Sequence, residues 1–240
     1  MKETKLTFKR TEKKYLLPAD RFDALWERIA PYLEPDEYPA STVCSIYYDT
    51  DDYRLIRHSI EGPVYKEKLR LRSYSVPGPE DPVFVELKKK YKGVVFKRRV
   101  CLSAREAEAW LDQGRKPQED SQIIREIDWF LHSVEPRAKA CLACDRQAWR
   151  GKADPELRIT FDRNIRWRET ELELCAGDGG EPLLEPGELL MEIKTPTAAP
   201  LWLAHTLSEL KIFPVSFSKY GTCYRDHILQ EYIFGGSIHA

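Results

Sequence analysis

The chain has 240 residues, of which 42% are hydrophobic and 32% are charged, and its formal net charge at pH 7 is −1. This apolar content is enough for a sizeable core, and a net charge near zero says little about the charge of a local site. The first ten residues are highly charged and no run of about 18 apolar residues occurs, so we expect a cytoplasmic protein without signal peptide or membrane span. Because no Gly/Ser-rich or Pro-rich linker divides the chain, we expect a single domain over residues 1–240.

The first predicted element is a helix after Pro18, because apolar residues recur there at steps of three and four: Phe22, Leu25, Trp26, Ile29 and Leu33. The period then changes to two, which predicts strands. In residues 66–72 every even position is basic, and Leu69 and Leu71 occupy the other face. Residues 83–90 and 94–102 alternate in the same way around Gly93, which predicts a hairpin whose basic residues face one another.

Two helices are predicted next, and a third near the end of the chain. Ser103 and Glu106 form a capping box ahead of residues 107–111, and residues 123–131 carry a second apolar stripe. Alternating strands follow at 139–149, 156–162 and 190–194, and a further helix covers 203–210 after Pro200. Cys141 and Cys144 form a C-x-x-C motif, but no second Cys or His pair stands at zinc-ligand spacing, so we interpret both as core thiols.

The polar faces of these strands carry most of the functional information. Any one of them is compatible with a solvent-exposed sheet face, but basic residues recur at the same phase on strand after strand. Like charges across neighbouring strands destabilise a sheet, and a phosphate chain bound between them would relieve this. If these strands close into a barrel, their polar faces converge on an interior where a phosphate chain would neutralise the basic side chains and Glu86 and Glu192 would bind Mg²⁺ or Mn²⁺. The sequence has no Walker loop, so side chains would bind the phosphate.

Eight short motifs, in this order, resemble those of the VTC (vacuolar transporter chaperone) domain family. The motifs are RTEKKY at 10–15, SIYYDT at 45–50, LRLR at 69–72, FVELK at 84–88, DRQAW at 145–149, LRITFD at 157–162, MEIK at 191–194 and FSKYG at 217–221. The resemblance implies an α+β fold, the triphosphate tunnel fold, in which an antiparallel β-barrel is flanked by helices. It also implies a polymerase that moves the γ-phosphate of ATP onto a polyphosphate chain, with Mn²⁺ favoured. Arg10, Glu12 and Lys14 stand where related tunnel enzymes carry E-x-E-x-K.

The resemblance and the strand pattern together give the predicted site. Its catalytic residues are Lys14, Arg70, Arg72, Lys88, Arg146, Arg158 and Lys219. Its further phosphate-binding residues are Arg10, Lys68, Lys97, Arg99, Lys194 and Ser218. Its metal ligands are Glu192, Glu86 and Glu12, for Mn²⁺ or Mg²⁺.

Two positions depart from the family pattern, since Ser216 replaces a lysine and Cys144 replaces a tyrosine that members often carry. Three functions therefore stay open: a polyphosphate polymerase acting on ATP, a hydrolase of triphosphate or nucleoside triphosphates, and a non-catalytic polyphosphate-binding module. Nucleic-acid binding is disfavoured because aromatic residues do not interleave with the basic ones on the ligand face.

Overall fold

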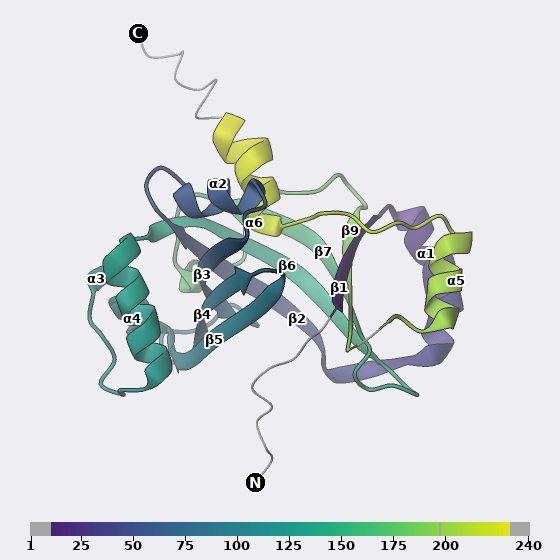
Figure 1. Cartoon of the computed structure of the whole chain (residues 1–240), viewed down its shortest axis with the longest axis horizontal. Coiled ribbons are helices and arrows are strands. Elements are labelled where there is room, and N and C mark those ends of the chain that lie inside the picture. The colour runs from purple at the N-terminus through teal and green to yellow at the C-terminus, as the bar shows by residue number, and fades with distance from the viewer. Residues whose placement is uncertain (1–10, 197, 231–240) are drawn as a thin grey trace. The chain divides into compact units, whose positions relative to one another are not determined.

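The computed structural model describes residues 11–196 and 198–230, which form a mixed α/β fold with one large antiparallel sheet and flanking helices (Figure 1). The strands are β1 (Thr11–Leu17), β2 (Leu33–Asp49), β3 (Tyr65–Ser73), β4 (Pro82–Tyr91), β5 (Val94–Ser103), β6 (Arg137–Gly151), β7 (Arg158–Arg168), β8 (Glu181–Pro182) and β9 (Leu189–Thr195). They are hydrogen-bonded in the order β1-β9-β7-β6-β2-β3-β4-β5, and β8 pairs with β7. Within the described residues, no helix is long and apolar enough to span a membrane.

The predicted antiparallel sheet with flanking helices is confirmed, but the described strands do not close into a ring. β1 and β5 lie at the two ends of the hydrogen-bonding order. The outer edge of β1 is bridged by Val215, whose backbone N–H donates to the carbonyl of Lys14 at 2.7 Å. A loop residue thus takes the position that a closing strand would need.

The described residues form two compact units. The first comprises the described residues up to Ser41 together with Cys144–Ile165 and Leu184–Phe217. The second comprises Thr42–Ala143, Arg166–Leu183 and the described residues from Ser218 onward. β2, β6 and β7 each contribute residues to both units. The single domain over residues 1–240 stays a prediction.

In the first unit, helices α1 (Ala19–Ile29) and α5 (Leu201–Glu209) lie side by side and bury their apolar faces (Figure 1). The core joins these helices to one face of three strands and contains Tyr15, Leu17, Leu25, Ile29, Ile159, Phe161, Met191, Ile193, Leu203 and Leu207. Both predicted helices are confirmed. α1 ends earlier than its apolar pattern suggested, because Pro31 lies in a 3₁₀ turn (Ala30–Tyr32) and β2 begins at Leu33.

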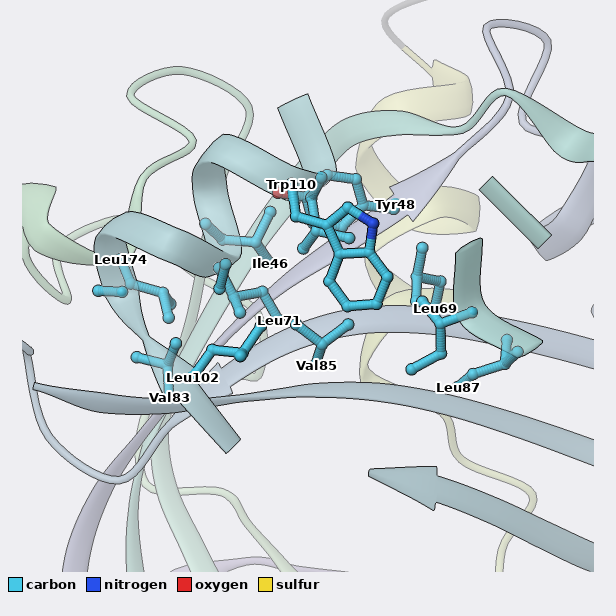
Figure 2. Packing of buried hydrophobic residues seen from close by; sticks show 14 of the residues in the cluster. Ile46, Tyr48, Leu69, Leu71, Val83, Val85, Leu87, Leu102, Trp110 and Leu174 are labelled. Carbon is cyan, nitrogen blue, oxygen red and sulfur yellow. The ribbon is translucent and has the colours of Figure 1, made fainter. Parts of the chain in front are cut away.

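In the second unit, helices α3 (Ala104–Gln113) and α4 (Gln122–Val134) contribute to the core that covers one face of β2, β3 and β4. Figure 2 shows Trp110 of α3 over the aliphatic side chains of these strands, including Leu71 and Val85. The predicted capping box at Ser103 and Glu106 is confirmed. Gly93 has φ of +83° and Lys92 has φ of +46°, as a two-residue hairpin turn between β4 and β5 requires.

The sequence analysis did not predict two short helices of the second unit, α2 (Arg54–Ile60) and α6 (Lys219–Cys223). A π-helical turn (Tyr224–Ile228) follows α6. Buried Asp49 joins α2 and α6. Its carboxylate accepts the backbone N–H groups of Leu55 at 2.9 Å and Ile56 at 3.0 Å, and the hydroxyl of Tyr220 at 3.2 Å. Two residues from the SIYYDT and FSKYG motifs therefore hold these helices together.

Candidate phosphate-binding site

Each unit presents one polar sheet face opposite its apolar core. We call them the first and the second polar face, after their units. The second polar face is described first and consists of Ser45, Tyr47, Lys66, Lys68, Arg70, Arg72, Glu86, Lys88, Lys97 and Arg99. Residues at these alternate positions point away from Leu69, Leu71, Val85 and Leu87, which are buried in the core. The sequence prediction that the basic residues at alternate positions of β3, β4 and β5 share one face is confirmed, and Lys89 and Arg98 lie on the opposite face.

Glu86 lies at the centre of the second polar face and is only 1% exposed. One carboxylate oxygen is 2.6 Å from Nη2 of Arg70, and the other is 2.6 Å from Nζ of Lys97 and 3.3 Å from Nε of Arg99. Burial acts to raise the pKa of Glu86, but the charges of Arg70, Arg72 and Lys97 outweigh it and lower the pKa to about 2. Glu86 is therefore an ionised counter-ion in a face that carries more cations than carboxylates.

A row of lysines crosses the strands next to Glu86. Lys68 of β3 lies opposite Lys88 of β4, which in turn lies opposite Lys97 of β5. Nζ of Lys68 donates to the hydroxyl of Ser218 at 3.2 Å, which also caps α6 by accepting the N–H of Gly221. Like charges placed opposite one another destabilise a sheet, so this row favours binding of an anion.

Tyr47 and Ser45 belong to this face although the sequence analysis did not single them out as site residues. The ring of Tyr47 stacks on Tyr220 at a centroid distance of 4.7 Å, and Nη1 of Arg70 donates to its hydroxyl at 3.4 Å. Nε of Arg72 donates to the hydroxyl of Ser45 at 3.0 Å. The alternating phase of these positions in β2 was the signal that could have identified them.

Tyr47 is expected to ionise near neutral pH. Burial acts to raise its pKa, but the charges of Arg70, Lys68 and Arg72 outweigh burial and lower the pKa to about 7. Because the pKa of an unfolded tyrosine is about 10, the phenolate adds stability as pH rises above about 7, and this contribution is lost as pH falls through that value. Tyrosinate absorbance should show one group titrating near pH 7 that is missing in Tyr47→Phe. If every tyrosine of the native protein titrates near pH 10 or above, the assignment is wrong.

The first polar face belongs to the first unit and is made by β1, β6, β7 and β9. Its residues are Glu12, Lys14, Arg146, Arg158, Thr160, Asp162, Glu192 and Lys194. Nζ of Lys14 lies 3.5 Å from Glu192 and 3.7 Å from Glu12, and Nζ of Lys194 lies 3.1 Å from Glu192. Two carboxylates and two lysines therefore alternate across β1 and β9.

Arg146 is held by a buried carboxylate on the neighbouring part of this face. Its Nε and Nη2 donate to the two oxygens of Asp162 at 2.6 and 2.7 Å, and Asp162 is 0% exposed. Burial acts to lower the pKa of Arg146, but the charges of Asp162 and Glu192 raise it above its usual value. Arg158 is more exposed, and its Nε lies 2.6 Å from Asp36.

The predicted site residues thus fall into two groups, each brought together within its own unit. Lys219 opens α6 in the second unit, and Arg10 lies outside the described residues. The convergence of both groups on one cavity stays a prediction. Cys141 and Cys144 are buried thiols on β6, as expected of core residues.

The predicted metal ligands differ in how well they fit a divalent ion. No group of three or more His, Cys, Asp or Glu side chains suited to a metal occurs in the described part of the chain. Glu12 and Glu192 could supply two carboxylates, leaving the remaining positions to phosphate oxygens and water, which is how Mg²⁺ and Mn²⁺ are commonly held. Glu86 fits less well, because Arg70, Lys97 and Arg99 already occupy both of its oxygens.

The fold of this chain resembles that of solved structures. Among solved structures, a Bacillus halodurans protein described as a "putative adenylate cyclase" superposes with a TM-score of 0.55 at 16% identity, over 86% of this chain and 92% of that one. A Vibrio parahaemolyticus protein with the same description gives a TM-score of 0.47 at 13% identity, over 90% and 97% of the two chains. No curated protein sequence matches. The Bacillus structure shows that the fold is shared.

One family model matches nearly the whole chain. The model of the VTC domain matches residues 9–227, a range that includes both polar faces. The chain therefore belongs to the VTC domain family.

Proposed function

We propose that this protein is a metal-dependent phosphotransferase that binds ATP and moves its γ-phosphate onto a growing polyphosphate chain. The observation that carries the proposal is the excess of cations on the second polar face, where Arg70, Lys97 and Arg99 surround one carboxylate and two further lysines, Lys68 and Lys88, lie beside them. Membership of the VTC domain family supports a polyphosphate-related role. The cytoplasmic location stays a prediction.

The side chains of both faces suit phosphoryl transfer, in which catalysis rests on positioning and on stabilising charge. Arg70 and Arg72 are fixed by Glu86, Tyr47 and Ser45, so their guanidinium groups are pre-oriented to contact non-bridging oxygens. Lys14 and Arg146 are fixed in the same way on the first polar face. A divalent ion bound at Glu192 and Glu12 would neutralise charge on adjacent phosphates.

The product formed from ATP tests the proposal. Incubation with ATP and Mn²⁺, followed by gel electrophoresis and phosphorus NMR, should reveal long-chain polyphosphate and ADP. Release of orthophosphate without chain growth would instead identify a hydrolase. Binding of triphosphate with no turnover would identify a binding module. Cys144 favours this third function, because the buried thiol stands where family members often carry a tyrosine hydroxyl.

Glu192→Gln tests the metal assignment. Glutamine preserves the shape of the side chain but removes the charge that a divalent ion needs, so Mn²⁺-dependent turnover should be lost while the fold is kept. Glu12→Gln should weaken Mn²⁺ binding less, because Glu12 is the more exposed of the two carboxylates. Wild-type turnover of Glu192→Gln at limiting Mn²⁺ would show that Glu192 is not a ligand.

A further inference from the structure

Thr160 occupies the centre of the first polar face, although the sequence analysis did not name it as a site residue. It lies on β7 between Ile159 and Phe161, whose side chains are in the core, so its own side chain lies on the polar face. Its strand partner is Glu192, which in turn faces Lys14 on β1. Thr160 therefore stands in the same cross-strand row as a predicted metal ligand and a predicted phosphate-binding lysine.

The hydroxyl of Thr160 is buried and has no hydrogen-bond partner among residues 11–196 and 198–230. The residue is 2% exposed, and Oγ1 makes no hydrogen bond there. A buried hydroxyl without a partner destabilises the folded state, and valine has nearly the same shape without this cost. Threonine is thus less stabilising than valine at this position in the ligand-free protein. The presence of the hydroxyl therefore points to a ligand that it contacts.

The neighbouring charged groups indicate what kind of ligand this is. Glu192 already has lysine partners on both sides, and Asp162, two residues along β7, is engaged by Arg146. These carboxylates therefore have strong donors, and the hydroxyl is left to donate to an acceptor that the ligand brings. A non-bridging phosphate oxygen held by Lys14 and Arg146 is such an acceptor.

We propose that the hydroxyl of Thr160 donates a hydrogen bond to a phosphate oxygen of the bound chain and so helps to position it. This rests on the proposed function, because it names an additional contact of the same site. Thr160→Val should bind tripolyphosphate about tenfold to a hundredfold more weakly, the range for a hydrogen bond to a charged group. Without ligand, the same variant should melt at the same temperature as wild type or higher, since a hydroxyl without a partner has been removed.

The experiment measures tripolyphosphate affinity by calorimetry and thermal stability without ligand, for wild type, Thr160→Val and Thr160→Ser. Thr160→Ser keeps the hydroxyl and should recover most of the affinity. Ser73→Ala is the matched control, because Ser73 is buried on β3 at the phase of the core residues and should not affect affinity. These titrations are run with chelator and then with Mn²⁺.

Each outcome distinguishes this inference from the proposed function. If wild type fails to bind tripolyphosphate, the proposed function fails. If wild type binds and Thr160→Val binds equally well, the function stands and the role of Thr160 is overturned. Loss of affinity only in the presence of Mn²⁺ would identify Thr160 as a metal contact and also overturn the assigned hydrogen bond. A large loss of stability in Thr160→Val would show that its role is structural.

Discussion

Replacing Glu86 with glutamine is expected to lower the free energy of unfolding by about 2–4 kcal/mol, because it removes the counter-ion of Arg70, Lys97 and Arg99. We expect a loss near the lower end of this range, because Lys97 and Arg99 are partly exposed and solvent screens their charges. Tripolyphosphate should raise the melting temperature of this variant more than that of wild type, since the anion supplies the missing negative charge. Chemical denaturation and thermal melts with and without tripolyphosphate measure both effects.

The pH dependence of unfolding provides an independent check on Glu86. Its pKa is lowered to about 2 in the folded protein, so its contribution to stability is fully present above its usual pKa of about 4.5. That contribution should be lost as pH falls through about 2, and Glu86→Gln should lack this part of the acid transition. Glu80→Gln is the matched control, because Glu80 pairs with Arg105 on the exposed surface and should change stability little. Equal denaturation midpoints for wild type and Glu86→Gln would contradict the counter-ion role.

The Arg146–Asp162 pair gives the second large effect. Asp162→Leu should destabilise the protein by about 3–5 kcal/mol, because it leaves the mostly buried guanidinium group of Arg146 without its bidentate partner. Arg146→Met should cost a similar amount, because buried Asp162 loses both of its hydrogen bonds from Arg146. The double variant should recover most of the loss, since replacing a whole buried pair by apolar side chains is often close to neutral.

Function should not recover with stability in that double variant. If Arg146 contacts phosphate, Arg146→Met/Asp162→Leu is folded but binds tripolyphosphate more weakly than wild type. A double-mutant cycle of unfolding free energies, combined with calorimetry on the double variant, separates the two roles. Full tripolyphosphate affinity in the double variant would restrict Arg146 to a structural role.

The sequence was most informative where periodicity alone decides which way a side chain points. The basic residues at alternate positions of β3, β4 and β5 share a face because side chains alternate along a strand, and the hairpin register follows from the turn at Gly93. Local capping chemistry likewise predicted α3 from Ser103 and Glu106. These features depend on residues close together in the chain.

Features that depend on distant residues were not predictable. Asp49 accepts a hydrogen bond from Tyr220, which lies 171 residues after it in the sequence. This contact joins two helices that are too short to show an apolar period. The pairing of Arg146 with Asp162 depends on which strands are neighbours. The same holds for Thr160, because only the three-dimensional structure reveals that its hydroxyl is buried without a hydrogen-bond partner in the described residues.

The central claim is that these polar sheet faces bind a phosphate chain, and a calorimetric titration of tripolyphosphate into wild type and Lys88→Met tests it most directly. Lys88 lies opposite Lys68 and Lys97, so Lys88→Met removes the central cation of this row. The account predicts that wild type binds tripolyphosphate and that Lys88→Met binds about fivefold to tenfold more weakly. Absence of binding to wild type, or equal affinity of the two proteins, would contradict it.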